Sequence, residues 1–297
     1  MGRADSRWRG YAETFSAALI NGSIGTIVSY ATMPVVMLVA LRMVFASAAL
    51  ALVLGLRHRW PRPKDRAAAL RLLLLGGVLA ANLTLYFIAI RETGVAVAIF
   101  TSYLAPVYVA ALGPRFAGGR TEGVVVVALL VALAGMLLIL LPGLRGAGLS
   151  PSGLAAGLGA GAFYAAYLLL TKNLRRRGLE STGIVFVMSA VTALLLLPWG
   201  LAQSSPADFG GVNVLMAAIL GVVTTALTFS LFVDGMHFIK VQHASIMGYI
   251  EPVSAPLYAL VLLGQRPSAW TIAGGALIVA AGVAVVALGK AEEELYG

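Results

Sequence analysis

Two ionisable residues stand inside long apolar stretches of the sequence. Glu251 directly precedes Pro252 near the middle of one stretch, and Arg42 lies about a third of the way into another. A charge in hydrocarbon costs several kcal/mol unless it is paired or hydrated, so an embedded carboxylate is a candidate for substrate or proton binding. Glu251 could bind a substrate amine or exchange a proton. Alternatively, it could satisfy backbone groups or pair with Arg42 as a structural charge, and Arg42 could instead bind a backbone carbonyl.

Tyrosine and asparagine side chains accompany this carboxylate. A tyrosine offers apolar area and a hydroxyl, which suits an amphipathic organic solute. Anchoring at the membrane interface is the competing explanation, and it fits Tyr11, Trp60 and Trp270 near the ends of apolar stretches better than residues in their middle. We predict the following substrate-binding residues: Asn21, Asn82, Tyr86, Tyr103, Tyr164, Tyr167, Tyr249 and Glu251.

Pro106 and Pro252 are predicted to break or gate their helices. Each removes one helical hydrogen bond and presses on the carbonyl four residues earlier, that of Ser102 or Gly248. Free carbonyls at membrane depth are tolerated only beside protein or a water-filled cavity. Both prolines therefore point to a cavity, and a simple packing kink is the alternative.

The composition excludes several classes of function. Of the 297 residues, 60% are apolar and 11% are charged, and the mean hydropathy is +0.93, whereas a soluble domain carries about a quarter charged residues. The chain has no cysteine and only three histidines, His58, His237 and His243, so we expect no metal site and no cofactor. Asp234, His237 and His243 could provide proton entry, but they fit better as loop and helix-end residues in contact with water. No ATP-binding P-loop occurs, so active transport would draw on an ion or substrate gradient.

Ten apolar stretches are long enough to cross a bilayer, which needs roughly 20 residues per helix. Their predicted bounds are 11–30, 34–56, 68–90, 94–113, 122–142, 152–171, 182–202, 212–234, 241–263 and 269–289. Glu13, Asn21 and Ser23 make the first span the weakest. With the N-terminus inside, 17 of the 21 Lys and Arg residues fall in inner segments and 3 in outer loops, which predicts cytoplasmic N- and C-termini. Topology thus explains the net charge of +9, and a nucleic-acid partner is not expected.

An internal repeat is indicated by two similar segments, Tyr103-Leu104-Ala105-Pro106 in the fourth span and Tyr249-Ile250-Glu251-Pro252 in the ninth. Each half would hold five helices, and because five is odd the second copy crosses the membrane in the opposite sense. We therefore predict an all-α membrane protein of ten transmembrane helices in two inverted five-helix repeats, 1–145 and 146–297. Such symmetry favours alternating access to a midplane cavity.

The order of these motifs resembles the EamA-type branch of the drug/metabolite transporter superfamily over nearly the whole chain. The resemblance rests on the Arg inside span 2, the Glu-Pro of span 9 and the Leu-Gly-Gln-Arg-Pro turn from Leu263 to Pro267. The chain departs from the common pattern at Ile20-Asn21-Gly22-Ser23, where a Trp-Gly pair is frequent, and at Gln265, where Glu is frequent. The resemblance implies a secondary transporter, and several such members export amino acids.

We therefore predict a secondary transporter, with export as the expected direction, that moves an amino acid or derivative across the inner membrane of a prokaryote. The expected partners are a small-molecule substrate and membrane lipids, with protons as a candidate coupling ion. The sequence leaves the oligomeric state open. The rival interpretations are a membrane enzyme or carrier that acts on lipid, which would need converging ionisable groups, and a passive channel, which would need a polar stripe that spans 5 and 7 do not provide.

Overall fold

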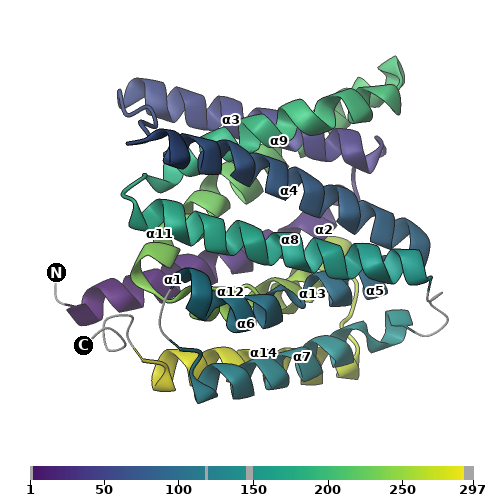
Figure 1. Cartoon of the computed structure of the whole chain (residues 1–297). Helices are drawn as coiled ribbons and strands as arrows, with labels where there is room; N and C mark the ends of the chain where they lie inside the picture. Colours follow the sequence, from purple (N-terminus) through teal and green to yellow (C-terminus); the bar gives the residue numbers. More distant parts are fainter. Residues whose placement is uncertain (1–2, 118–119, 145–149, 291–297) are drawn as a thin grey trace.

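The computed structural model describes residues 3–117, 120–144 and 150–290, and within these ranges the chain is helical with no strand. Figure 1 shows the long helices lying side by side. The α-helices are α1 (Arg3–Asn21), α2 (Ser23–Val28), α3 (Val35–Leu56), α4 (Arg66–Thr93), α5 (Val95–Ser102), α6 (Ala105–Ala117), α7 (Gly123–Leu144), α8 (Pro151–Arg176), α9 (Ser181–Ala202), α10 (Gly211–Gly221), α11 (Thr228–Phe238), α12 (Val241–Met247), α13 (Ile250–Leu263) and α14 (Ala269–Leu288). A 3₁₀ turn, η1 (Pro206–Phe209), precedes α10, and a π-helix, η2 (Val222–Leu227), joins α10 to α11.

The described part of the chain contains nine stretches that are long and apolar enough to cross a membrane, from Val35–Leu56 to Ala269–Leu288. They correspond to the predicted spans 2 to 10. The predicted first span forms α1 and α2, but the helix begins at Arg3 rather than at residue 11 and is interrupted at Gly22. Charged residues of its first turns, such as Arg9 and Glu13, keep it below the hydropathy of the other nine, so ten crossings stay a prediction.

Large apolar side chains cover the outside of the helix bundle. Leu56, Leu194 and Val261 are 74%, 72% and 80% exposed. An extensive exposed apolar surface is unfavourable in water and is expected where helices face lipid. The chain is therefore an integral membrane protein.

Polar residues set the starts of several helices. Asp65 caps α4 by accepting a hydrogen bond from the Ala68 N–H at 2.6 Å. Ser150 caps α8, and Pro151 occupies the first helical position, where no helical hydrogen bond is lost. Ser268 caps α14 in the same way. These caps define where apolar helices meet polar loops.

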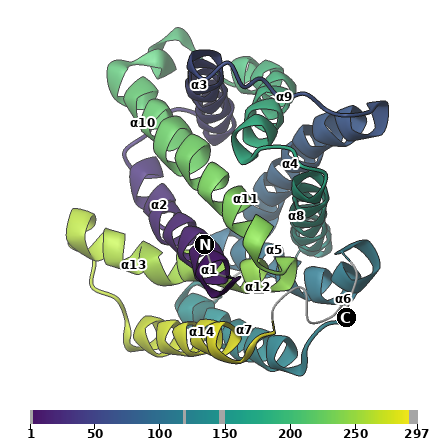
Figure 2. The same cartoon turned by 90° about the vertical axis from the view of Figure 1, so that its left-hand side faces the viewer.

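The most extensive helix pairings are α4 with α8, α7 with α14, α3 with α9 and α1 with α11, and Figure 2 shows α7 beside α14 at one side of the bundle. The α7–α14 crossing requires glycine, because a Cβ at Gly274 would overlap the carbonyl oxygen of Gly135. Helices in the second half begin at regular intervals after those in the first. For example, the starts of α3 and α9, and those of α7 and α14, are separated by the same spacing in sequence as Tyr103 and Tyr249.

Both predicted proline breaks coincide with interruptions of a helix. Pro106 is the second residue of α6 and Pro252 the third residue of α13, so each lies in the first turn of a new helix rather than at a kink. Of the two residues whose carbonyls were predicted to be freed, Gly248 lines the cavity described below and Ser102 does not. The Gly248 carbonyl accepts a hydrogen bond from the Glu251 N–H at 3.1 Å, and the Ser102 carbonyl packs against Gly161 of α8.

Candidate substrate-binding cavity

A cavity of about 30 Å³ lies among α1, α4, α8, α11 and the break between α12 and α13. Its lining consists of Ala18, Asn21, Leu79, Tyr164, Tyr167, Phe229, Phe232, Gly248 and Glu251. This volume admits about two water molecules but no organic solute. The protein is therefore closed around the cavity in this conformation.

Glu251 stands in the first turn of α13 and contributes the only carboxylate of the cavity lining. It interacts electrostatically with Arg42 of α3 and with three tyrosines, Tyr86, Tyr103 and Tyr164. These partners come from helices that are far apart in the sequence. A carboxylate surrounded by hydroxyl groups can accept hydrogen bonds from an ammonium group or bind a proton.

Tyr103 and Tyr249 join the two helix breaks. Their rings stack with centroids 5.8 Å apart at 26°, and the Tyr249 hydroxyl donates a hydrogen bond to the Tyr103 carbonyl at 2.6 Å. Tyr249 is fully buried and does not line the cavity. Its role in this conformation is therefore to hold the two breaks together, while Tyr103 interacts electrostatically with Glu251.

Aromatic rings form another wall of the cavity. Tyr164 and Tyr167, on successive turns of α8, stack with centroids 5.7 Å apart at 6°. The ring of Phe229 lies 6.3 Å from that of Tyr167. This wall therefore presents apolar area and hydroxyls rather than charge. Asn21 completes the lining, and its Oδ1 accepts a hydrogen bond from the Thr228 hydroxyl at 2.8 Å.

Arg42 is held by the π-helix rather than by an ion pair with Glu251. Its Nε donates to Thr225 Oγ1 at 2.5 Å and its Nη2 to the Thr224 carbonyl at 3.0 Å. The guanidinium also lies 5.8 Å from the ring centre of Phe229. The backbone-carbonyl partner considered from the sequence is thus the one observed. Glu251 contributes at longer range.

The predicted site residues divide into three groups. Asn21, Tyr164, Tyr167 and Glu251 line the cavity, and Tyr86 and Tyr103 flank the carboxylate. Asn82 instead donates to the Ala160 carbonyl at 2.7 Å and ties α4 to α8, as Tyr249 ties the breaks. The apolar lining residues Ala18, Leu79, Phe229 and Phe232 escaped prediction because nothing distinguishes them in sequence from other lipid-facing or core residues.

One cluster of charges joins α1, α8 and α11 at the end of the bundle where α1 begins. Asp234 accepts hydrogen bonds from Arg9 and from Arg175, both at 2.8 Å, and Arg9 also pairs with Glu13 at 2.7 Å. Asp234 was expected to contact water. It does so only in part, because its carboxylate joins three helices.

A second cluster joins α7, α12 and the end of α14. Glu122 pairs with Lys240 Nζ at 2.5 Å and His243 Nε2 at 3.2 Å and accepts the Lys290 N–H at 2.7 Å. Burial raises the pKa of Glu122, but these partners outweigh burial and hold it below the ordinary value. The prediction for His243 was wrong, because it is buried with its Nδ1 2.7 Å from the Tyr11 hydroxyl. Tyr11 is likewise buried and not an interface anchor.

The sixth span extends further than the sequence predicted, and it includes Lys172. The sequence placed it in a polar break after residue 171, yet α8 continues to Arg176 and Lys172 is only 2% exposed. Its Nζ donates to the carbonyls of Met236 and Ile239 at 2.7 and 2.9 Å. A cation there binds the carbonyls at the end of α11, where helix carbonyls lack partners.

The profile of the EamA-like transporter family matches residues 8–141 and 151–288. An uncharacterised transporter of Archaeoglobus fulgidus is 36% identical over 66% of this chain and 68% of its own length. The uncharacterised transporter YxxF of Bacillus subtilis is 27% identical over 88% and 84%. The threonine/homoserine exporter RhtA of Salmonella typhimurium is 25% identical over 71% and 69%.

A crystal structure has the same fold. It covers 94% of this chain and 97% of its own, with a TM-score of 0.79 at 20% sequence identity. At that identity the likeness concerns the arrangement of helices alone.

Proposed function

This chain belongs to the EamA-like transporter family, and from that premise we propose that it exports an amino acid or a close derivative across the inner membrane of a prokaryote. It is a transmembrane transporter, as its apolar helices and its relatives indicate. The proposal concerns the cargo, the direction and the site. The similarity to relatives named as threonine/homoserine exporters supports an amino acid as cargo.

The observation that carries the proposal is the carboxylate of Glu251 in a closed cavity walled by tyrosines. A substrate ammonium group would bind Glu251, and the rings of Tyr164 and Tyr167 would contact the rest of the molecule. Arg42 lies near enough to Glu251 to interact electrostatically. A site with one acid and one nearby base suits a zwitterion better than a strongly anionic solute, which would need more cations.

We place both termini in the cytoplasm and count α1 and α2 as the first of ten crossings. Ion pairs show that the start of α1, the ends of α8 and α11 and the start of α9 lie at one end of the bundle. That end also holds most of the Lys and Arg residues, as the positive-inside rule requires of a cytoplasmic side. The intervals between corresponding helices support inverted repeats at 1–145 and 146–297.

Alternating access would proceed by opening this cavity to either side in turn. The Asp234 and Glu122 clusters lie at the proposed cytoplasmic end and join helices of both repeats, α1 with α8 and α11, and α7 with α12. They would have to separate before substrate enters from the cytoplasm. The conformation described here therefore corresponds to a state closed on that side.

A counterflow experiment tests the site and the cargo together. Proteoliposomes loaded with unlabelled threonine, homoserine or other amino acids would be assayed for uptake of the labelled solute, with and without a proton gradient. We expect saturable counterflow that E251Q lowers at least tenfold. E180Q is the matched control, because Glu180 forms an exposed pair with Arg59 and does not line the cavity.

Tyr249 provides a second variant. Y249F removes the hydrogen bond to the Tyr103 carbonyl and should lower flux, whereas Y258F, which lies on α13 outside the cavity lining, should not. Unchanged flux and unchanged pH dependence in both E251Q and Y249F would show that the site is misplaced. Absence of flux for every solute, with folded protein, would move the cargo toward lipid.

A further inference from the structure

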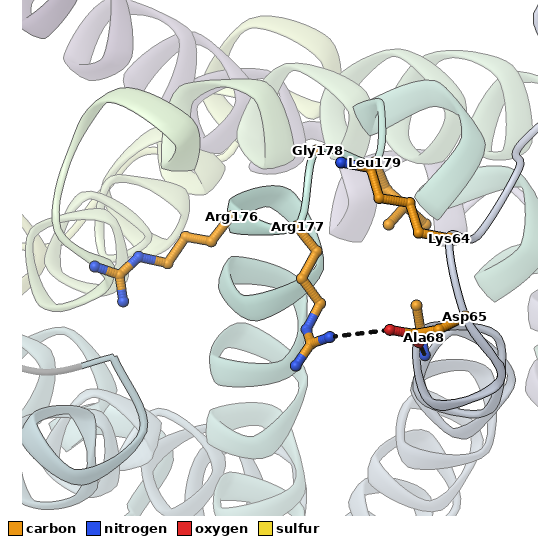
Figure 3. A pocket seen from close by; sticks show the side chains of 7 residues that line it. All are labelled: Lys64, Asp65, Ala68, Arg176, Arg177, Gly178 and Leu179. Atoms are coloured by element: carbon orange, nitrogen blue, oxygen red, sulfur yellow. Dashed lines mark hydrogen bonds and ion pairs between the residues drawn. The ribbon is translucent and has the colours of Figure 1, made fainter.

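A larger hollow, of about 320 Å³, lies outside the transport cavity, where α4 begins and α8 ends. Its lining consists of Lys64, Asp65, Ala68, Arg176, Arg177, Gly178 and Leu179. Figure 3 shows the Lys64 side chain directed toward Gly178 and Leu179 and the Arg177 side chain directed toward Asp65, with which it forms an ion pair, while Arg176 extends to the other side of α8. The hollow is therefore built from cations at the ends of two separate membrane helices.

The hollow's lining has more cations than carboxylates, and its one carboxylate, Asp65, is already engaged. One oxygen of Asp65 accepts a hydrogen bond from the Ala68 N–H at 2.6 Å, and the other forms an ion pair with Arg177 Nη1 at 3.6 Å, while Arg177 Nε donates to Asn173 Oδ1 at 3.1 Å. Glu180 is paired with Arg59 at 3.2 Å. With Lys64 and Arg177 against the one carboxylate of its lining, the hollow keeps a net positive charge and suits an anion.

Neighbouring side chains place the hollow at the level of lipid headgroups. Trp60, 47% exposed, packs edge-on against Phe186 of α9 with ring centres 5.6 Å apart. Tryptophan is enriched at this depth of the membrane. Leu70, just beyond the first turn of α4, is 67% exposed and marks the beginning of the lipid-facing surface. The hollow thus lies between the apolar and aqueous zones.

We propose that this hollow binds the phosphate group of an anionic membrane phospholipid. Nε and Nη1 of Arg177 are engaged by Asn173 and Asp65, so Arg177 Nη2 and the Lys64 ammonium group would supply the donors to the phosphate oxygens. A free phosphate shares this chemistry, but the interfacial position favours a lipid, whose headgroup is held at that depth at high local concentration. Basic pockets between membrane helices on the cytoplasmic side are suited to such headgroups. The bound lipid would bridge the ends of α4 and α8.

Native mass spectrometry of the whole protein in detergent tests this proposal by counting bound lipid. Dioleoylphosphatidylglycerol would be titrated against dioleoylphosphatidylcholine, using wild type, the double variant K64Q/R177Q and the control R57Q/R62Q. The control removes the same charge from residues of the loop before α4 that do not line the hollow. We expect binding of phosphatidylglycerol to weaken at least tenfold in the double variant and less than threefold in the control.

Three outcomes would overturn the proposal. One is equal binding of phosphatidylglycerol by wild type and K64Q/R177Q. Another is an equal loss in R57Q/R62Q, which would indicate diffuse attraction to the whole loop. The third is displacement of the lipid by inorganic phosphate at millimolar concentration, which would indicate a site for the free anion. Thermal unfolding without added lipid verifies that both variants fold, and because no step measures flux, the result is independent of the proposed function.

Discussion

Asp234→Asn should weaken the ion pairs that we propose close the cytoplasmic side of the cavity. The carboxylate joins α11 to α1 through Arg9 and to α8 through Arg175, with both distances at 2.8 Å. An asparagine of the same size keeps the packing but removes the charge that attracts both guanidinium groups. In the open state these helix ends would be separated, so the substitution acts mainly on the closed state.

The exposures of the side chains set the size of the effect. Arg175 is 11% and Asp234 26% exposed, and a charge-assisted hydrogen bond in such surroundings contributes about 1.5–3 kcal/mol. The Arg9 side chain is 44% exposed, so its pair adds less than about 1 kcal/mol. Since asparagine retains part of the hydrogen bonding, we expect a net loss of about 1.5 kcal/mol, which is about a tenfold shift toward the open state.

Cysteine accessibility measures this shift directly, because the chain contains no cysteine. Ala18 lines the cavity and is buried, so A18C would be labelled in proteoliposomes by a charged, impermeant maleimide applied from each side. D234N should raise the labelling rate from the proposed cytoplasmic side about tenfold, and E180Q, which breaks only an exposed pair, should not. An unchanged rate, or an equal rise in E180Q, would refute the assignment of Asp234 to the closure.

Three further predictions concern other contacts. Burial raises the pKa of Glu122, but its hydrogen bonds from Lys240 and a backbone N–H lower the pKa overall. The ionised carboxylate therefore stabilises the folded protein above its ordinary pKa of 4.5, and this stabilisation is lost as the pH falls through the lowered pKa. E122Q should flatten this decline in melting temperature on the acid side. G274A should cost about 1–3 kcal/mol by overpacking the α7–α14 crossing, whereas G275A, whose added Cβ would meet its nearest neighbour at 3.5 Å, should unfold like wild type in a fluorimetric melt. T225V removes the hydroxyl that accepts a hydrogen bond from the buried Arg42 Nε, and it should lower the free energy of unfolding by about 1–3 kcal/mol. A melting temperature equal to that of the wild type would contradict this role.

The sequence predicts the elements of this fold well because residue type alone carries the signal. Long apolar stretches separated by charged loops locate spans 2 to 10, and Pro106 and Pro252 locate the helix breaks. The first span is harder, since Arg9 and Glu13 look like loop residues until their partners are known. Both can lie in α1 because their charges have partners on other helices: Asp234 pairs with Arg9, and Arg175 attracts Glu13.

The site is predictable only where an unusual residue marks it. Glu251 and its tyrosines are conspicuous in apolar helices, and several of them do converge. Asn82 looks equally conspicuous but satisfies a backbone carbonyl of a neighbouring helix, and His243 and Lys172 are buried against partners that are distant in the sequence. Periodicity within one helix contains no information about such distant partners, so their burial could not be foreseen.

The scaffold repeats, but its charges do not. At the spacing that relates α3 to α9, Arg42 corresponds to Met188, and Glu251 corresponds to Ala105, and both of these apolar counterparts are fully buried. Each repeat therefore contributes one charge of opposite sign, and neither charge has a counterpart in the other half. If the repeats exchange conformations during transport, the proposed zwitterionic substrate would meet the same carboxylate in both states, because Glu251 lies in the first turn of α13 beside the break. The symmetry would then allow the movement, while these two charges, which have no counterpart in the other repeat, would orient the proposed substrate.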